Sequence, residues 1–314
     1  EKSTLKGDNN RFRSDKQRDE MRWDIMTKKD TQTMNKAKGG SLFESAIRKL
    51  PLNRLPHFES GMIQFEAASS NEELAEVSDA LSAQLPALCA MQSKPLLQGA
   101  SISETPDQPK RIALLFSGGP ASGGHNIVVG VHEVLGNKHT LLGVKAGPKG
   151  LLKGDLVEIT EEDVSHIRNT GGFDFLGSDR TKIKTDAQFE KVRTVVREHK
   201  LDGLIIVGGD DSNTNAAFLA DRLADLNCAV VGAPKTIDGD LQVGSLLPIS
   251  FGFHTATRIY AEMVGNILQD TPSSRKYWHF VKLMGRSASH VTLEVALQTQ
   301  AHFALISEEV KTKK

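Results

Sequence analysis

The fold class is decided by the stretch Leu204-Ile205-Ile206-Val207-Gly208-Gly209-Asp210-Asp211, in which an apolar run ends in two glycines and two carboxylates. An uninterrupted apolar run of this length is typical of a parallel strand that is buried on both faces. Glycine lets the backbone approach an anion, and the N-terminus of a following helix offers free N–H groups. A carboxylate beside them can hold the magnesium that accompanies polyphosphates. The motif alone is equally compatible with an ordinary turn that ends in an acidic helix cap.

Two similar loops flank this stretch at the spacing of strand-helix units. Upstream, the apolar run 112–116 leads into residues 117–126, where four glycines fall within the seven residues from Gly118 to Gly124. Downstream, the run 229–232 leads into residues 233–240, which carry a lysine, a threonine and two aspartates. Three strand ends then place their polar residues on one edge of a sheet, where ligands of open α/β folds bind.

Strand and helix patterns alternate from residue 110 onward, which indicates a parallel sheet with right-handed crossovers. The expected strands cover residues 111–116, 141–145, 203–207, 229–233 and 278–283. The expected helices cover residues 124–136, 161–168, 186–199, 213–225, 255–270 and 287–300. We therefore predict an α/β fold.

The composition is that of a globular protein and limits its partners. The chain has 314 residues, of which 39% are hydrophobic and 25% charged, and its formal net charge is zero. No global field favours a nucleic acid or an anionic membrane, so we expect neither as a partner. Two cysteines give no disulfide framework, which favours a cytoplasmic location. No apolar run is long enough to span a membrane, and the polar start does not resemble a signal peptide.

The part of the chain before the first glycine loop divides into two segments by composition. Residues 1–40 are rich in charged and polar side chains, and we expect a disordered arm. Residues 41–109 are expected to form a helical N-terminal extension and a linker. Helices are indicated at 42–50 and 72–85, and four prolines between Pro86 and Pro109 mark the linker.

Several motifs together resemble the phosphofructokinases, and specifically the long pyrophosphate-dependent group, with the plant-type catalytic subunit as the nearest likeness. The motifs are residues 117–126, 171–180, 208–215, 234–241, 250–253 and 277–290. The resemblance covers about residues 110–310. It implies a phosphofructokinase-like parallel-sheet domain that binds pyrophosphate and Mg²⁺ at 110–254. Residues 255–314 would be the start of a second, similar domain that binds the sugar phosphate, which we expect to be truncated.

The resemblance implies a role for each residue of the glycine and aspartate loops. Asp238 occupies the position of the family's catalytic base, although a helix-capping aspartate is the alternative. Thr236 would hold the reacting group, and Arg180 would neutralise the charge that develops during transfer. Asp210 would be the Mg²⁺ ligand. Two glycines would cradle phosphate through their N–H groups, Gly118 and Gly119.

The expected sugar-phosphate contacts lie further along the chain. They are Thr236, Asp238, Asp240, Tyr277, Met284, Gly285 and Arg286. Asp240 could instead be a simple turn carboxylate, and Met284 could be a core residue.

The choice of donor is expected to depend on Asp211 and Lys235. In the ATP-using relatives both positions are glycine, and the space that they leave admits the nucleotide. A carboxylate at Asp211 would put bulk and like charge where the α-phosphate should lie. Lys235 adds a cation that can pair with a compact donor, so we predict that pyrophosphate is used.

The implied activity is the reversible transfer of a phosphoryl group from pyrophosphate to the 1-hydroxyl of fructose 6-phosphate, giving fructose 1,6-bisphosphate, in a homo- or hetero-oligomer. The sequence departs from the family at Ser122, at His254 and in length, since family members continue well beyond residue 310. The alternatives are a non-catalytic regulatory subunit or inactive fragment of the same enzyme, an ATP-dependent phosphofructokinase, or another kinase with a Gly-Gly-Asp loop.

Overall fold

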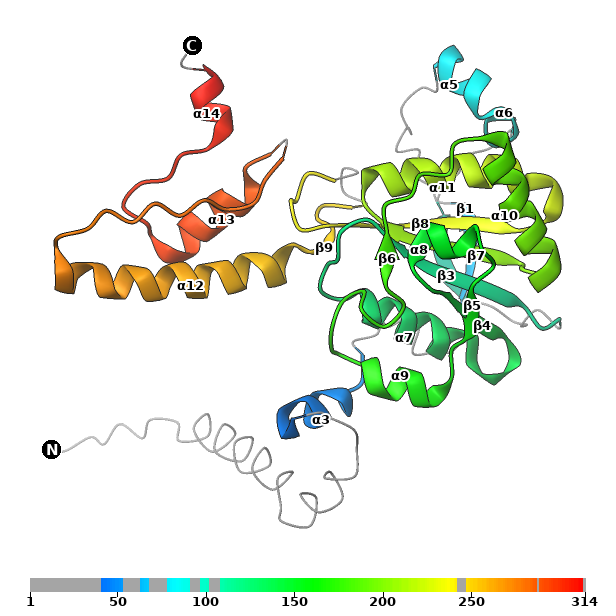
Figure 1. The fold of residues 1–314 in the computed structure, drawn as a ribbon, viewed down its shortest axis with the longest axis horizontal. Helices are drawn as coiled ribbons and strands as arrows, with labels where there is room; N and C mark the ends of the chain where they lie inside the picture. Colours follow the sequence, from blue (N-terminus) through cyan, green and yellow to red (C-terminus); the bar gives the residue numbers. More distant parts are fainter. Residues whose placement is uncertain are drawn as a thin grey trace, which may run out of the picture.

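The computed structural model describes residues 41–52, 63–67, 78–90, 97–101, 108–241, 247–286 and 288–312. The charged arm expected at 1–40 lies outside these residues, as do residues 72–77 of the helix expected at 72–85, and the described remainder is helical over Asp79–Gln84. The described part consists of a sheet covered by helices and an arm of three helices that projects from one end (Figure 1).

A seven-stranded sheet forms the centre, with the strand order β5-β4-β3-β7-β8-β9 and β6 paired to the end of β3. All pairs are parallel except β4 with β5. The strands are β3 (Arg111–Ser117), β4 (Thr140–Val144), β5 (Leu156–Glu158), β6 (Ser178–Asp179), β7 (Gly203–Gly208), β8 (Ala229–Thr236) and β9 (Phe251–Gly252). The predicted α/β class is confirmed, and so are the four strands expected between residues 111 and 233.

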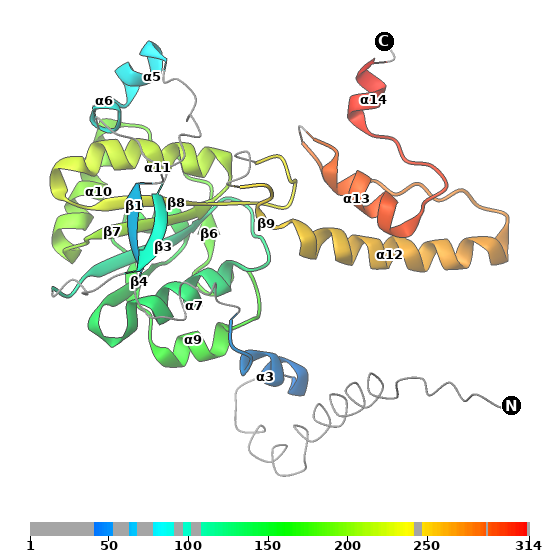
Figure 2. The same ribbon diagram turned by 180° about the vertical axis from the view of Figure 1, so that it is seen from behind.

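Helices cover both faces of this sheet, as Figures 1 and 2 show from opposite sides. They are α7 (Gly124–Leu135), α8 (Gly147–Leu151), α9 (Glu161–Ile167), α10 (Asp186–His199) and α11 (Asp210–Leu223). Because side chains alternate along a strand, β3 contributes Ala113 and Leu115 to a core with α10 and α11. Leu114 and Phe116 of the same strand pack with α7 and α9 on the other face. The sheet is therefore the middle of three layers.

Two of these helices begin at a threonine that caps the first turn. The Asp163 N–H donates to Thr160 Oγ1 at the start of α9, and the Gln188 N–H donates to Thr185 Oγ1 at the start of α10. In both helices the side chain three residues on accepts a bond from the cap backbone, which completes a capping box. These local signals explain why both starts could be predicted from the sequence.

The segment before β3 contacts the three-layer part through Leu52, which packs against its core, and through single polar side chains. It contains α3 (Leu42–Arg48), α5 (Asp79–Gln84), α6 (Pro86–Cys89) and an antiparallel pair, β1 (Ile63–Ala67) with β2 (Leu97–Ser101). The sequence did not indicate this pair. Asp221 Oδ1 accepts from the first N–H groups of α6, and Asn169 Nδ2 donates to the carbonyls of Ile47 and Leu50 at the end of α3.

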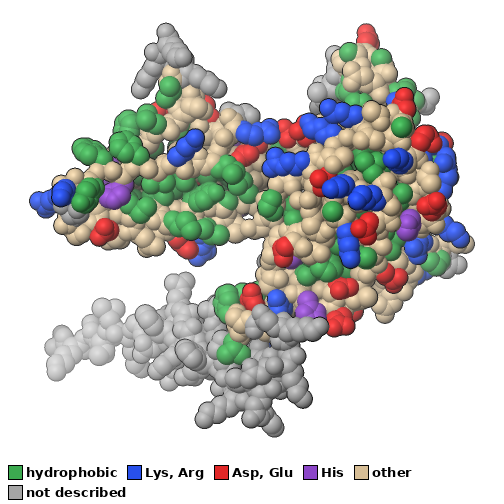
Figure 3. Space-filling model, in the orientation of Figure 1, with side chains coloured by type: hydrophobic (Ala, Val, Ile, Leu, Met, Phe, Trp, Pro, Cys, Tyr) green, Lys and Arg blue, Asp and Glu red, His purple; other side chains and the backbone are tan. Residues whose placement is uncertain are grey.

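The arm that follows β9 is formed by α12 (Phe253–Ser274), α13 (His290–Thr299) and α14 (Ser307–Thr312). The strand predicted at 278–283 is wrong, because these residues have no regular secondary structure. Within the described residues no neighbouring strand bonds to them, and the alternation of aromatic residues cannot form a strand by itself. The side chains of Trp278 and Phe280 are accordingly 90% and 93% exposed. Figure 3 shows hydrophobic side chains over much of this arm.

In the described ranges, no helix combines the length and apolar character needed to cross a membrane.

Substitutions of two valines in α7 can test the packing on the face of the sheet that α7 and α9 cover. Val128 is fully buried, whereas Val134 on the same helix is 68% exposed. We expect Val128→Ala to lower the free energy of unfolding by about 2 kcal/mol, because two methyl groups leave a cavity in a close-packed core. Val134→Ala should change it by less than about 0.5 kcal/mol. Urea unfolding of both variants measures the difference, and equal effects would contradict the burial of this helix face.

Candidate active site

A cavity of about 860 Å³ opens at the carboxyl ends of the central strands. It gathers most of the residues that the sequence predicted for the site. Those that line it are Gly118, Gly119, Arg180, Asp210, Asp211, Lys235, Thr236, Asp238, Asp240, Met284 and Arg286. Acidic and basic side chains also gather where the arm joins the three-layer part (Figure 3). The three loops therefore meet at one edge, as the sequence predicted.

Two predicted residues do not line this cavity. Tyr277 is 61% exposed on the arm, where the Lys276 ammonium lies 5.5 Å from the centroid of its ring. Gly285 lies between two lining residues without lining the cavity itself. The sequence analysis missed Lys182 and Asn215, which do line it. The signal for Lys182 was a second cation two positions after Arg180, in a loop that was already part of a motif.

The glycine loop after β3 is fixed by two hydrogen bonds to β6. The Gly118 N–H donates to the carbonyl of Asp179 at 3.0 Å, and Ser178 Oγ donates to the carbonyl of Gly118 at 2.8 Å. Gly118 has a φ of 88°, which favours glycine. A Cβ at Gly119 would lie 3.3 Å from Arg180 Nη2. The loop thus holds backbone close to a guanidinium, an arrangement suited to a phosphate group.

Helix α11 begins at Asp210, three residues before the predicted start at 213. The two carboxylates in its first turn stabilise the positive end of the helix dipole. Its N-cap residue, Gly209, supplies no side-chain hydrogen bond to the first turn. The Ser212 hydroxyl donates to the buried Ser117 hydroxyl at 2.8 Å and so ties this helix to the end of β3. The start of the helix lies at the cavity, where the positive end of its dipole suits an anion.

Asp238 lies in a turn just beyond β8 and is held by Thr236. The Asp238 N–H donates to Thr236 Oγ1 at 3.0 Å, and Ser250 Oγ donates to the carbonyl of Thr236 at 2.9 Å. Asp238 caps no helix, since the next described helix begins at Phe253. Its Oδ1 is buried and accepts no hydrogen bond from the described protein. A buried carboxylate oxygen without a partner is costly unless a ligand supplies one.

Asp210 is paired with an arginine of the arm. Arg286 Nη2 lies 2.7 Å from Asp210 Oδ2, and this hydrogen bond lowers the pKa of Asp210 below its usual range. The carboxylate is therefore ionised at neutral pH. The sequence assigned these two residues to different ligands, and their direct contact could not be predicted because 76 positions separate them.

Lys235 is half-buried at the base of the cavity. Burial lowers the pKa of its ammonium group, while the carboxylates of Asp238 and Asp210 oppose that shift. The nitrogen lies 5.9 Å from the centroid of the Phe173 ring. No ion pair with another described residue engages this lysine. It therefore presents a positive charge that an anionic ligand can use.

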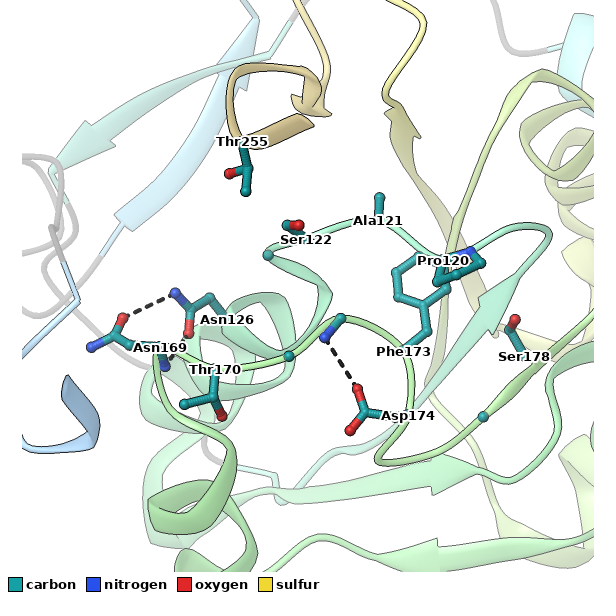
Figure 4. Close-up of a pocket in the computed structure, with 14 residues that line it drawn as sticks. Pro120, Ala121, Ser122, Asn126, Asn169, Thr170, Phe173, Asp174, Ser178 and Thr255 are labelled. Carbon is teal, nitrogen blue, oxygen red and sulfur yellow. Dashed lines mark hydrogen bonds between the residues drawn. The ribbon is translucent and has the colours of Figure 1, made fainter. Parts of the chain in front are cut away.

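A second cavity of about 850 Å³ borders the glycine loop at residues 120–123 (Figure 4). Pro120 lines both cavities, but none of the predicted site residues lines this one. Its wall is built from loop 169–174, in which the Gly172 N–H donates to Asp174, and the side chains of Asn126 and Asn169 are paired. A Cβ at Gly124 would meet the Gly172 carbonyl at 2.5 Å, so the wall packs directly on the glycine loop.

The strands of this parallel sheet end in a glycine loop, a helix N-terminus and a cluster of cations and carboxylates. This combination is typical of proteins that bind phosphate groups. Residues 111–314 match the family described as phosphofructokinase, and the chain belongs to that family.

Two curated relatives illustrate the similarity. The chain is 51% identical over 214 residues to a pyrophosphate–fructose 6-phosphate 1-phosphotransferase of Treponema pallidum, which covers 66% of this chain and 37% of the relative. It is 47% identical over 234 residues to subunit beta 2 of the Arabidopsis thaliana enzyme of that name, which covers 73% of this chain and 41% of the relative. The chain thus spans well under half the length of these relatives.

The fold is also found in a crystal structure of a pyrophosphate-dependent phosphofructokinase from Marinobacter aquaeolei. The TM-score is 0.55 at 22% sequence identity, over 63% of this chain and 53% of the other. At that identity the likeness supports the fold alone.

The buried His125 provides a test of the wall beside the glycine loop. Its Nε2 accepts from the Phe175 N–H at 3.2 Å, and burial lowers its pKa from 6.5, although the Asp174 carboxylate opposes the shift. The unfolded chain therefore binds a proton more readily than the folded chain. The stability that comes from keeping His125 neutral should be fully present above pH 6.5 and should be lost as the pH falls below this value.

The measurement is the thermal midpoint of wild type and His125→Gln between about pH 7.5 and about pH 5.5. We expect the wild-type midpoint to fall more steeply with acid than that of the variant. Parallel curves would show that this histidine is not held neutral in the fold.

Proposed function

We propose that the protein transfers a phosphoryl group reversibly from pyrophosphate to the 1-hydroxyl of fructose 6-phosphate, giving fructose 1,6-bisphosphate and phosphate. Family membership and the names of the relatives support this reaction. The observation that carries it is the buried Asp238 oxygen, which has no hydrogen-bond partner among the described residues and belongs to a cavity rich in phosphate-binding groups.

Asp238 is proposed as the general base. Its backbone is fixed by Thr236 Oγ1, so the carboxylate is in place before the sugar binds. The free Oδ1 can accept the proton of the attacking 1-hydroxyl, which makes that oxygen a better nucleophile. In the reverse direction the protonated carboxyl returns the proton to the leaving sugar oxygen. Thr236 would orient the reacting group beside it.

Pyrophosphate is proposed to bind between the glycine loop and the start of α11. The N–H group of Gly119 and those of the first helical turn would contact its oxygens, whereas the N–H of Gly118, expected from the sequence to do the same, is already bonded to the Asp179 carbonyl. Arg180 and Lys235 would balance charge that moves to the leaving phosphate. These groups come from rigid strand ends, so their positions do not have to be reorganised during transfer.

Asp210 is proposed to hold Mg²⁺ together with phosphate oxygens. Among the described residues no cluster of three or more His, Cys, Asp or Glu side chains could hold a metal alone. A single ionised carboxylate fits Mg²⁺, which is usually bound by one or two carboxylates and substrate phosphates. When bound, the ion would neutralise charge on the donor. Arg286 would then exchange its contact with Asp210 for the phosphate of the sugar.

The rest of the sugar site is proposed from Asp240, Met284 and the segment 285–286. Asp240, Met284 and Arg286 line the cavity. Gly285 would contribute backbone, while Tyr277 would have to turn toward the cavity from its exposed position. The guanidinium of Arg286 suits the 6-phosphate because it can bind two oxygens at once.

The donor is proposed to be pyrophosphate because Asp211 and Lys235 both line the cavity. The regulatory-subunit alternative is disfavoured, since a non-catalytic subunit does not need Asp210, Lys235 and Asp238 to converge. Within this proposal, residues 110–254 bind pyrophosphate and Mg²⁺, and residues 255–314 begin the sugar-phosphate part. A cytoplasmic, oligomeric enzyme is part of the same proposal.

Asp238→Asn tests the reaction and the base together. In the protein as its gene encodes it, we expect kcat with pyrophosphate and fructose 6-phosphate to fall by roughly 10² to 10⁴, because an amide cannot take the proton. Pyrophosphate should still bind. The exposed Asp270 on α12 lies outside the cavity, and Asp270→Asn is the matched control. Turnover of Asp238→Asn within a few-fold of wild type would remove Asp238 from this role.

The donor preference is tested by replacing both Asp211 and Lys235 with glycine. We expect the ratio of kcat/KM for ATP to that for pyrophosphate to rise by at least about tenfold, because bulk, like charge and one cation are removed together. Asp211→Gly alone should open the space, and Lys235→Gly alone should mainly weaken the use of pyrophosphate. If the double variant keeps the wild-type ratio of kcat/KM for ATP to that for pyrophosphate, these two residues do not select the donor. The proposal would then be reduced to a phosphofructokinase whose donor is unknown.

A further inference from the structure

We infer that Lys182 is a positioning residue for donor selection, which holds the carboxylate of Asp211 and offsets its charge. This inference rests on the proposed function, because it concerns how pyrophosphate is admitted to the same cavity. Lys182 Nζ lies 2.8 Å from Asp211 Oδ1, and both residues line the cavity.

The backbone beside Lys182 is clamped to the same face of α11. Asn215 Nδ2 donates to the carbonyl of Ile183 at 2.7 Å, and the Ile183 N–H donates to Asn215 Oδ1 at 3.3 Å. The Ile183 side chain is 2% exposed, so it also anchors the loop in the core. Asp211 and Asn215 are four positions apart and therefore lie on one side of the helix. The loop and the helix are thus held in register at two neighbouring points.

The charge of Asp211 alone cannot explain a preference for pyrophosphate. Both candidate donors are polyanions, so an unpaired carboxylate in the cavity would repel either of them. Selection requires that the bulk of Asp211 remains while its charge is offset for the smaller donor. The ammonium of Lys182 does both, because it pairs with the carboxylate and holds it at the start of α11.

The ion pair contributes little to folding. The two side chains are 45% and 67% exposed, and exposed pairs typically contribute about 0 to 1 kcal/mol. Removing Lys182 should therefore leave the fold intact. Its effect should appear in the binding of the donor, where an unpaired negative charge faces an anion.

The test uses steady-state kinetics with pyrophosphate and ATP on the protein as its gene encodes it. We expect Lys182→Met to raise KM for pyrophosphate by about tenfold while kcat changes less than about threefold. Lys182→Arg keeps the charge and should stay close to wild type. Lys184→Met is the matched control, since Lys184 is exposed two positions further along the loop and does not line the cavity.

The decisive variant combines Lys182→Met with Asp211→Asn. If the lysine acts through the carboxylate, removing that charge should return KM for pyrophosphate to within about threefold of Asp211→Asn alone. Calorimetric binding of pyrophosphate with Mg²⁺ should show the same pattern independently of turnover.

Three results would overturn the inference. One is an unchanged KM for pyrophosphate in Lys182→Met, and another is a full Lys182→Met effect in the Asp211→Asn background, which would mean that the lysine contacts the donor directly. The third is a wild-type protein that does not use pyrophosphate. Only that third result also overturns the proposed function, so failure of the inference about Lys182 can be told apart from failure of the proposed function.

Discussion

The hydrogen-bonded register of β3, β7 and β8 is the constraint on which the rest of the structure depends. Phe116 pairs with Val207, and Val207 pairs with Ala233, so the glycine loop after β3 and the start of α11 after β7 leave the sheet at the same level. β8 continues to Thr236 and pairs there with β9, so the turn that holds Asp238 follows three residues beyond Ala233. β3 and β7 are buried, as the near-zero exposure of Leu114 and Leu204 shows, whereas β8 is buried only at its end. A slip of one residue would reverse every side chain and separate these loops, so the core and the site are specified together.

How much could be predicted from the sequence depended on the range of the interaction involved. The central strands were predicted because burial on two faces leaves a continuous apolar run, and the predicted starts of α9 and α10 agree with the structure, where capping boxes within three residues fix them. The start of α11 was missed, since aspartates were assigned to a loop although they favour the first helical turn. The strand at 278–283 was wrong because a strand needs neighbours that a sequence pattern does not supply. The ion pairs Arg286–Asp210 and Lys182–Asp211 join distant segments and only the structure brings them together.

These two ion pairs divide the acidic start of α11 between different parts of the molecule. Asp211 is bound by a lysine of the α/β part, from a loop that is clamped to the same helix. Asp210 is bound by an arginine of the arm. A ligand that competes for Asp210 therefore changes a contact between arm and sheet, whereas the neighbouring pair can stay intact. The two adjacent carboxylates of this helical turn therefore hold different parts of the molecule: Asp210 holds the arm, and Asp211 holds the loop that carries Lys182.

Asn169 joins the N-terminal segment to the wall behind the glycine loop. It has a φ of 55°, a conformation that asparagine tolerates better than most residues, and its side chain and N–H pair with Asn126 of α7. The same amide donates to the carbonyl of Ile47 in α3 and to that of Leu50 just beyond the helix. One asparagine therefore serves both the docking of α3 and the placement of loop 169–174 against α7, so exchanging its side chain would loosen two separate parts of the molecule at once.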